Sequence, residues 1–231
     1  VKRTRTRCKM GNRESAYRGV RDRIDVAAAE RSSFRGAERP VRLVAVSKRQ
    51  SVEAIHELAA LGQRDFGENY LQEALDKQQA LGDLSLTWHF IGPIQSNKTR
   101  SIAAHFDWVH SVDRVKLVRR LGEHRDPAAG PLNLLIQVNV DGEASKSGAA
   151  PDEVPAIVAA CAEQPTLRLQ GLMCIPRPGN TAAFEQLAAL NAQLAEPLPE
   201  LSMGMSGDFE TAIAAGSTIV RVGTALFGPR D

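Results

Sequence analysis

The segment Arg42-Leu43-Val44-Ala45-Val46 is a short apolar run, and Ser47-Lys48 follows it directly. A short apolar run of this kind is typical of a β-strand. A helical pattern over Val52–Leu61 comes next, and Gly62 marks the end of that helix. The stretch therefore predicts a strand–helix unit with a lysine at the carboxyl end of its strand.

Similar units follow along the rest of the chain. After an opening helix over about residues 14–31, strands are expected at 42–46, 65–67, 88–91, 108–112, 132–140, 167–175, 201–203 and 218–222. Eight strands, each followed by a helical pattern, predict an α/β fold, a single (β/α)8 TIM barrel over residues 14–231. A doubly wound open sheet is the alternative, but no Gly-x-Gly-x-x-Gly motif follows the first strand.

The amino-acid composition is that of one large α/β domain with a basic start. The chain has 231 residues, of which 43% are hydrophobic, and a net charge of +2. Five Lys and Arg side chains lie in the first nine residues without an acid, which leaves +2 − 5 = −3 for the remainder. We therefore expect a disordered basic tail over residues 1–13, outside the core, and no binding of nucleic acid. The native start is either Val1 or Met10.

Several classes of protein are excluded by the sequence. No run approaches the roughly 18 apolar residues of a membrane span, and no apolar stretch follows the basic start as in a secretory signal. The three cysteines, Cys8, Cys161 and Cys174, are widely spaced and form no metal-binding pattern. The five histidines have no paired ligand spacing either. We therefore expect a cytoplasmic protein without a metal site, with Cys161 and Cys174 in the core.

The functional residues of such a barrel gather at the carboxyl ends of its strands. The candidates at this rim are Lys48 after the first strand, Asn69 after the second, Ser206 after the seventh, and Arg221, Gly223 and Thr224 at the end of the eighth. A lysine amine combined with hydroxyls and glycine N–H groups suits pyridoxal 5′-phosphate (PLP). The aldehyde of PLP reacts with a lysine, and its phosphate is bound by N–H donors.

Structural roles can be predicted for two further residues near this rim. Asp208 is expected to cap a helix over Phe209–Ala215, whose free N–H groups would then favour a phosphate. His89 lies between Trp88 and Phe90, and we expect it to be a hydrogen-bonded core histidine instead of a catalytic base.

Six stretches of the chain closely resemble one known family, the pyridoxal phosphate homeostasis proteins. They are Ala45-Val46-Ser47-Lys48, Phe66-Gly67-Glu68-Asn69-Tyr70, the run from Trp88 to Lys98, Ser145-Lys146-Ser147-Gly148, the run from Leu201 to Ser206, and the run from Val220 to Gly228. The resemblance covers about residues 14 to 230 and implies a barrel similar to the N-terminal domain of alanine racemase. It also implies a role in vitamin B6 and amino-acid homeostasis, without an established reaction.

The resemblance also implies roles for individual residues. Lys48 would hold PLP as a Schiff base, Arg221 would face the pyridine nitrogen, and Asn69 would line the cofactor site. The phosphate would be bound by Ser206, Gly223 and Thr224. Many members have a second lysine where this chain has Gln50, so transfer of PLP through that position is not expected here. Lys146 is a candidate second acceptor of PLP.

Two functions from different classes fit these residues, a PLP carrier and a single-domain PLP-dependent racemase. The sequence stops seven residues after Thr224, which leaves no room for the second domain from which racemases of this fold draw a second base. Arginine cannot protonate the ring nitrogen, which weakens the cofactor as an electron sink. We therefore expect a monomeric, non-enzymatic PLP carrier, with PLP-dependent apo-enzymes as partners and the racemase as the alternative.

Overall fold

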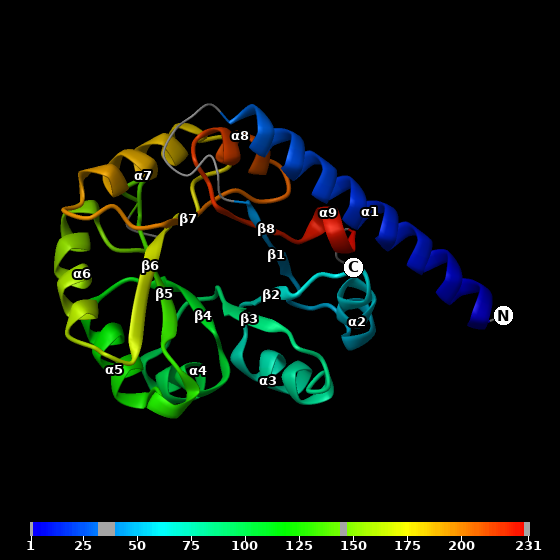
Figure 1. Ribbon diagram of the computed structural model, residues 1–231, viewed down its shortest axis with the longest axis horizontal. Coiled ribbons are helices and arrows are strands. Elements are labelled where there is room, and N and C mark those ends of the chain that lie inside the picture. The colour runs from blue at the N-terminus through cyan, green and yellow to red at the C-terminus, as the bar shows by residue number, and fades with distance from the viewer. Residues whose placement is uncertain (1, 32–39, 144–146, 229–231) are drawn as a thin grey trace.

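The computed structural model describes residues 2–31, 40–143 and 147–228, with the backbone alone for residues 2–11. Eight parallel strands form a closed barrel in the order of the sequence, and helices surround it (Figure 1). The strands are β1 Arg42–Val46, β2 Asp65–Glu68, β3 Thr87–Phe90, β4 Trp108–Val112, β5 Leu132–Gln137, β6 Leu167–Met173, β7 Glu200–Ser202 and β8 Ile219–Val222. Strand β8 pairs with β1 and closes the barrel, so the predicted (β/α)8 fold is confirmed.

Strand β5 is the one that departs most from its predicted bounds. It was expected to reach residue 140 but ends at Gln137. Val138 N still donates to Met173 O of β6 (2.8 Å), but from Gln137 onward the chain also pairs with the returning end of its own loop. Ala149 N donates to Gln137 O (2.8 Å), and Asn139 N donates to Ala149 O (2.9 Å). The apolar run alone could not reveal this additional partner.

Helices follow the strands and cover the outer face of the barrel. They are α1 Lys2–Glu30, α2 Val52–Ala60, α3 Leu71–Ala80, α4 Thr99–His105, α5 Val115–His124, α6 Val154–Ala162, α7 Ala182–Gln193, α8 Phe209–Ala214 and α9 Thr224–Phe227. Short 3₁₀ helices lie at Ser96–Lys98, Pro127–Ala129 and Pro151–Glu153. Within the described ranges, no helix is long and apolar enough to cross a membrane.

The first helix is longer than predicted. Helical backbone begins at Lys2, whereas a disordered tail was expected over residues 1–13. Lysine and arginine favour helices, and no proline interrupts the segment, so the helix continues past the predicted boundary. Arg13 forms an ion pair with Glu57 of α2, and the first turns of α1 extend beyond α2 and α9 (Figure 1). That the residues before Arg13 add nothing to the core stays a prediction.

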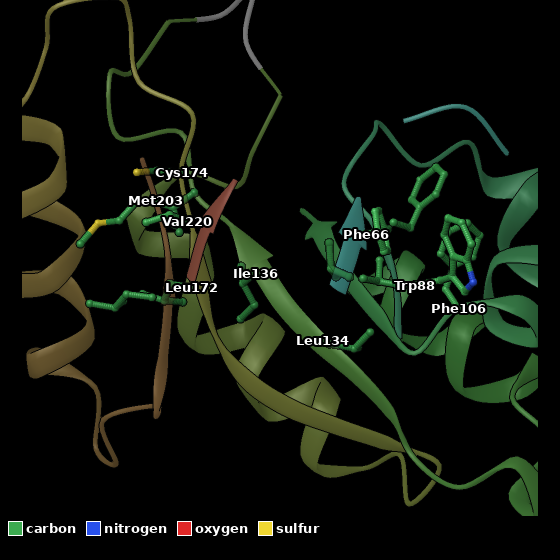
Figure 2. Close-up of a cluster of buried hydrophobic side chains, with 14 of the residues drawn as sticks. Phe66, Trp88, Phe106, Leu134, Ile136, Leu172, Cys174, Met203 and Val220 are labelled. Carbon is green, nitrogen blue, oxygen red and sulfur yellow. The ribbon is translucent and has the colours of Figure 1, made fainter. Parts of the chain in front are cut away.

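The alternation of side chains along the strands divides the core into two layers. Outward-facing residues such as Phe66, Trp88, Leu134, Leu172 and Val220 pack between the strands and the helices (Figure 2). A separate cluster of inward-facing residues fills part of the barrel interior. It consists of Val44, Trp108, Leu135, Met173 and Ile219. Because successive residues of a strand point to opposite faces, polar residues between the outward-facing positions also point into the barrel.

The pairing of β1 with both of its neighbours positions the rim. Ala45 of β1 lies opposite Phe66 of β2 on one side and Val222 of β8 on the other. Parallel strands end at the same face of a barrel. The residues that follow these three strands, among them Lys48, Asn69 and Gly223, therefore lie around one segment of the rim.

Candidate functional site

Lys48 lies in a tight turn directly after β1. Gln50 N donates to Ser47 O (2.9 Å) and closes the turn. The side chain of Lys48 is half-buried, as expected for an amine at the edge of a ligand site. Asn69 follows β2 on the adjacent strand and is also half-buried. Its main chain packs so closely against Gly92 that a Cβ at Gly92 would lie 2.2 Å from Asn69 O.

The loops after β7 and β8 meet at Ser206. The Oγ of Ser206 accepts hydrogen bonds from the main-chain N–H groups of Gly223 and Ala225, each at 3.3 Å. A Cβ added at Gly223 would lie 3.5 Å from both Cβ and O of Val46, at the end of β1. Two N–H donors therefore converge on an oxygen atom beside the strand that carries Lys48.

Asp208 does not cap the following helix as predicted. Its carboxylate accepts a hydrogen bond from Met205 N (2.6 Å), on the side away from the helix, and makes no side-chain cap bond. The helix that follows, α8, is only six residues long. The aspartate thus stabilises the loop that presents Ser206 and leaves the N–H groups of α8 without its carboxylate.

Arg221 points into the barrel from β8 and is almost completely buried, with 4% of its surface exposed. Its Nη1 donates to Ser202 Oγ (2.6 Å), and its Nη2 donates to Cys174 O (2.9 Å). Burial lowers the pKa of the guanidinium from its usual value. An arginine remains protonated despite such a shift, so a fixed positive charge lies beneath the rim.

A chain of hydrogen bonds extends from this arginine through the barrel. His110 Nδ1 lies 3.0 Å from Ser202 Oγ, and His110 Nε2 lies 2.9 Å from His89 Nδ1. His89 Nε2 in turn lies 3.0 Å from Asp65 Oδ1. Asp65 begins β2, so the chain connects the opposite end of the barrel with the buried arginine. His89 is a hydrogen-bonded core histidine, as the sequence predicted.

The donors along this chain have a single direction. Burial lowers the pKa of His89 and lowers that of His110 further, so both rings are neutral near pH 7. Since Asp65 accepts, His89 Nε2 carries the proton and its Nδ1 accepts from His110. His110 Nδ1 then accepts from Ser202, whose oxygen accepts from Arg221. Every bond is thus donated away from the arginine and towards the carboxylate of Asp65.

Sequence reasoning did not find Asp65, His110 or Ser202. Their positions in the strands could have revealed them, because side chains alternate between the two faces of a strand and each of the three lies at an inward-facing position. Polar residues at inward positions of three different strands would have indicated a buried polar network.

The residues at the rim fit PLP by the chemistry of their donors. The site combines a lysine amine, two converging main-chain N–H groups and a guanidinium beneath the rim, and each suits one group of the cofactor. Within the described part of the chain, Asn69 Oδ1 is buried without a hydrogen-bond partner, so it can accept from a ligand. Lys146 lies outside the described residues.

The barrel and this rim define the class of protein. The family model described as "Alanine racemase, N-terminal domain" matches residues 30–231. The alanine racemase of Corynebacterium glutamicum shares the fold, with a TM-score of 0.68 at 18% identity over 96% of this chain and 61% of that one. At this identity the likeness concerns the fold alone.

More similar relatives define the family within this class. Proteins named pyridoxal phosphate homeostasis protein are 56% identical in Pseudomonas aeruginosa, over 89% of this chain and 93% of that one, and 50% identical in Escherichia coli, over 92% and 94%. The structure of PipY from Synechococcus elongatus with PLP bound has a TM-score of 0.76 at 39% identity, over 89% of this chain and all of that one. The chain belongs to the pyridoxal phosphate homeostasis protein family.

Proposed function

We propose that this protein binds PLP as a Schiff base on Lys48 and serves intracellular PLP and amino-acid homeostasis. The observation that carries the proposal is the position of the Ser206 site. Two N–H groups converge there next to Val46, two residues before Lys48. A phosphate bound by these groups would place the rest of the cofactor at the rim that Lys48 shares. The related protein PipY, whose structure contains bound PLP, supports the assignment.

The remaining residues have complementary roles in this proposal. Ser206, Gly223 and Thr224 bind the phosphate, and Asn69 accepts from a polar group of the ring. Arg221 donates to the pyridine nitrogen from below, where its other N–H groups are already held by Ser202 and Cys174. PLP-dependent apo-enzymes in the cytoplasm are the proposed recipients, and the carrier acts as a monomer.

A carrier fits the arginine better than a catalyst does. A guanidinium does not give its proton to the ring nitrogen, so the ring remains a weak electron sink for carbanion chemistry. The hydrogen-bond chain that begins at Arg221 Nη1 is consistent with this, because each of its bonds is donated towards Asp65 and none brings a proton to Arg221. The site is therefore suited to hold PLP reversibly.

The direct test is an absorbance spectrum of the purified protein with PLP, before and after borohydride reduction. A band that borohydride removes, with the pyridoxyl group mapped to Lys48, supports the proposal. Incubation of the loaded protein with a PLP-dependent apo-enzyme should then restore the activity of that enzyme. A spectrum identical to that of free PLP would rule out the Schiff base.

Thr224→Ala should weaken the binding of PLP more than the binding of pyridoxal, which has no phosphate. Thr224 is the first residue of α9 and is exposed at the rim. A lost hydrogen bond to a charged group costs about 1.5–3 kcal/mol, roughly ten- to a hundredfold in affinity. Titrations followed by absorbance measure the affinity of the protein for each ligand. Thr211→Ala, on the exposed face of α8, is the control and should change neither. Equal weakening of both ligands would show that Thr224 does not bind the phosphate.

Turnover separates the carrier from the alternative, a single-domain racemase. With a weak electron sink, removal of the Cα proton of alanine, serine or glutamate should be slow. Deuterium exchange at Cα in heavy water, followed with chiral analysis, should therefore show no efficient racemisation. A kcat near the ~10 s⁻¹ typical of enzymes, lost in Lys48→Ala, would establish the racemase instead.

A further inference from the structure

The turn that carries Lys48 is held from outside the barrel by helix α3. Lys77 Nζ donates to the main-chain O of Ser47 (2.7 Å), the residue before Lys48. On the other side, the main-chain N–H of Arg49 donates to Glu73 Oε1. Both peptide groups that flank Lys48 are therefore attached to side chains of α3.

These two contacts belong to one buried charge cluster. Lys77 Nζ also contacts Glu68 Oε1 (2.7 Å) and Glu73 Oε1 (2.6 Å), so its three N–H donors are all used. Ser47 Oγ donates to the same oxygen of Glu68 at 2.6 Å. The side chain of Lys77 is 6% exposed and that of Glu68 is 0% exposed. The cluster thus reaches Ser47 through both its carbonyl and its hydroxyl.

Apolar residues would fill this place between strand and helix at lower cost. Removing charges from water is unfavourable even when they are paired. Burial also raises the pKa of Glu68, against the effect of Lys77 and Ser47, and within the described ranges Glu68 Oε2 has no hydrogen-bond partner. A buried ion pair of this kind adds little to stability. It is better explained by the specific geometry that it imposes on the turn.

The backbone of the turn requires such support. Arg49 has a φ of 62°, and it is the only non-glycine residue with left-handed backbone among those that the structure describes. Glycine adopts this conformation freely, but an arginine is held there only where the surroundings determine it. The Glu73 contact to Arg49 N is one such constraint. The strained turn therefore depends on α3 for its shape.

We propose that Lys77, together with Glu68 and Glu73, is a positioning group that directs the Lys48 amine towards the aldehyde of PLP. The proposal rests on the proposed function of Lys48. Lys77 does not contact the cofactor in this arrangement, and it acts only through the peptide groups on either side of Lys48. Its contribution should therefore appear in formation of the carbon–nitrogen bond and not in binding of the phosphate.

Two probes separate these effects. PLP can form the bond to Lys48, whereas 4′-deoxypyridoxine 5′-phosphate has the same ring and phosphate but a methyl group in place of the aldehyde. Lys77→Met should weaken the binding of PLP and should slow formation of the bond to Lys48 by about ten- to a hundredfold, because misplaced reacting groups lose rate on this scale. It should leave the affinity for the analogue unchanged. The visible circular dichroism of bound PLP should also change, because the Lys48 linkage takes another direction.

Arg125→Met is the matched control for lost stability. Arg125 is a buried cation that donates to main-chain carbonyls, those of Ala103 (2.7 Å) and Phe106 (3.0 Å). These carbonyls precede β4, at the end of the barrel opposite to the rim. The control variant should unfold more readily than the wild type but bind PLP and the analogue as the wild type does.

A milder variant covers the case in which Lys77→Met does not fold. Glu73→Gln keeps the Lys77–Glu68 pair and removes the charge that contacts both Arg49 N and Lys77 Nζ. It should weaken PLP in the same selective manner, by a smaller factor. Equal loss of PLP and the analogue in either folded variant, or no loss of either, would overturn the positioning role. If peptide mapping places PLP on another lysine in the wild type, the proposed function itself fails.

Discussion

Replacing Lys48 with alanine should abolish the borohydride-reducible absorbance band of the PLP-loaded protein. The neutral amine of Lys48 is the group that condenses with the aldehyde, so that a C=N bond replaces the C=O bond and the carbonyl oxygen leaves as water. Alanine offers no replacement for this amine. Noncovalent binding should persist in part, because Ser206, Gly223 and Thr224 do not depend on the amine. The expected result is thus a complete loss of the band together with a measurable residual affinity for the phosphate-bearing ligand.

Lys98→Ala is the matched control for this experiment. Lys98 lies in the short 3₁₀ helix after β3, at the same face of the barrel, and is exposed. Its removal should leave the band and its borohydride sensitivity intact. A Lys48→Ala protein that keeps the band, with the reduced cofactor mapped to Lys146 or another lysine, would show that the Schiff base forms elsewhere.

The strands and the rim could be predicted from the sequence because they depend on local patterns. The run at Leu43–Val46 is apolar, short and followed by a helical pattern, and the structure places β1 at the predicted residues. The residues after each strand then reach the same rim by the geometry of the barrel alone. This is why Lys48, Asn69 and Ser206 could be chosen without any knowledge of contacts.

The parts that could not be predicted depend on partners far away in the sequence. Lys77 and Ser47 are separated by 30 positions, and His110 and Ser202 by 92. No periodicity connects such pairs. Asp208 followed the pattern of a helix cap, yet its carboxylate accepts from the backbone of its own loop. Aspartate side chains often accept from nearby backbone N–H groups of a loop instead of capping a helix. The pattern of hydrophobic residues does not show which of the two will occur.

The second large effect expected concerns acid, and it arises from the buried histidine pair. His89 and His110 are both completely buried, and burial lowers the pKa of each below the usual 6.5. Asp65 acts in the opposite direction on His89 but does not reverse the shift. In the unfolded chain the two rings titrate near 6.5. Below that pH the unfolded state therefore binds more protons than the folded state does.

The sign of the effect follows from this difference in bound protons. Stability rises with pH wherever the unfolded state binds more protons, so the free energy of unfolding should fall as the pH drops below 6.5. The loss of stability should grow as the pH falls further below that value, for as long as the two buried rings remain neutral. Glu68 contributes in the opposite sense, because its pKa is raised by burial. The histidine contribution must therefore be isolated by substitution.

A double variant, His89→Gln and His110→Gln, isolates the contribution of the two histidines to the pH dependence of stability. Glutamine is polar and does not titrate, so this protein should be less stable at every pH but should lose less stability between about pH 8 and about pH 5.5. Urea unfolding at the two pH values measures the difference. His56→Gln, on the exposed face of α2, is the control and should retain the dependence of the wild type. If the double variant retains it as well, the two histidines are not held neutral in the folded barrel. The directional chain from Arg221 to Asp65 would then have to be assigned differently, because a protonated His110 can no longer accept from Ser202.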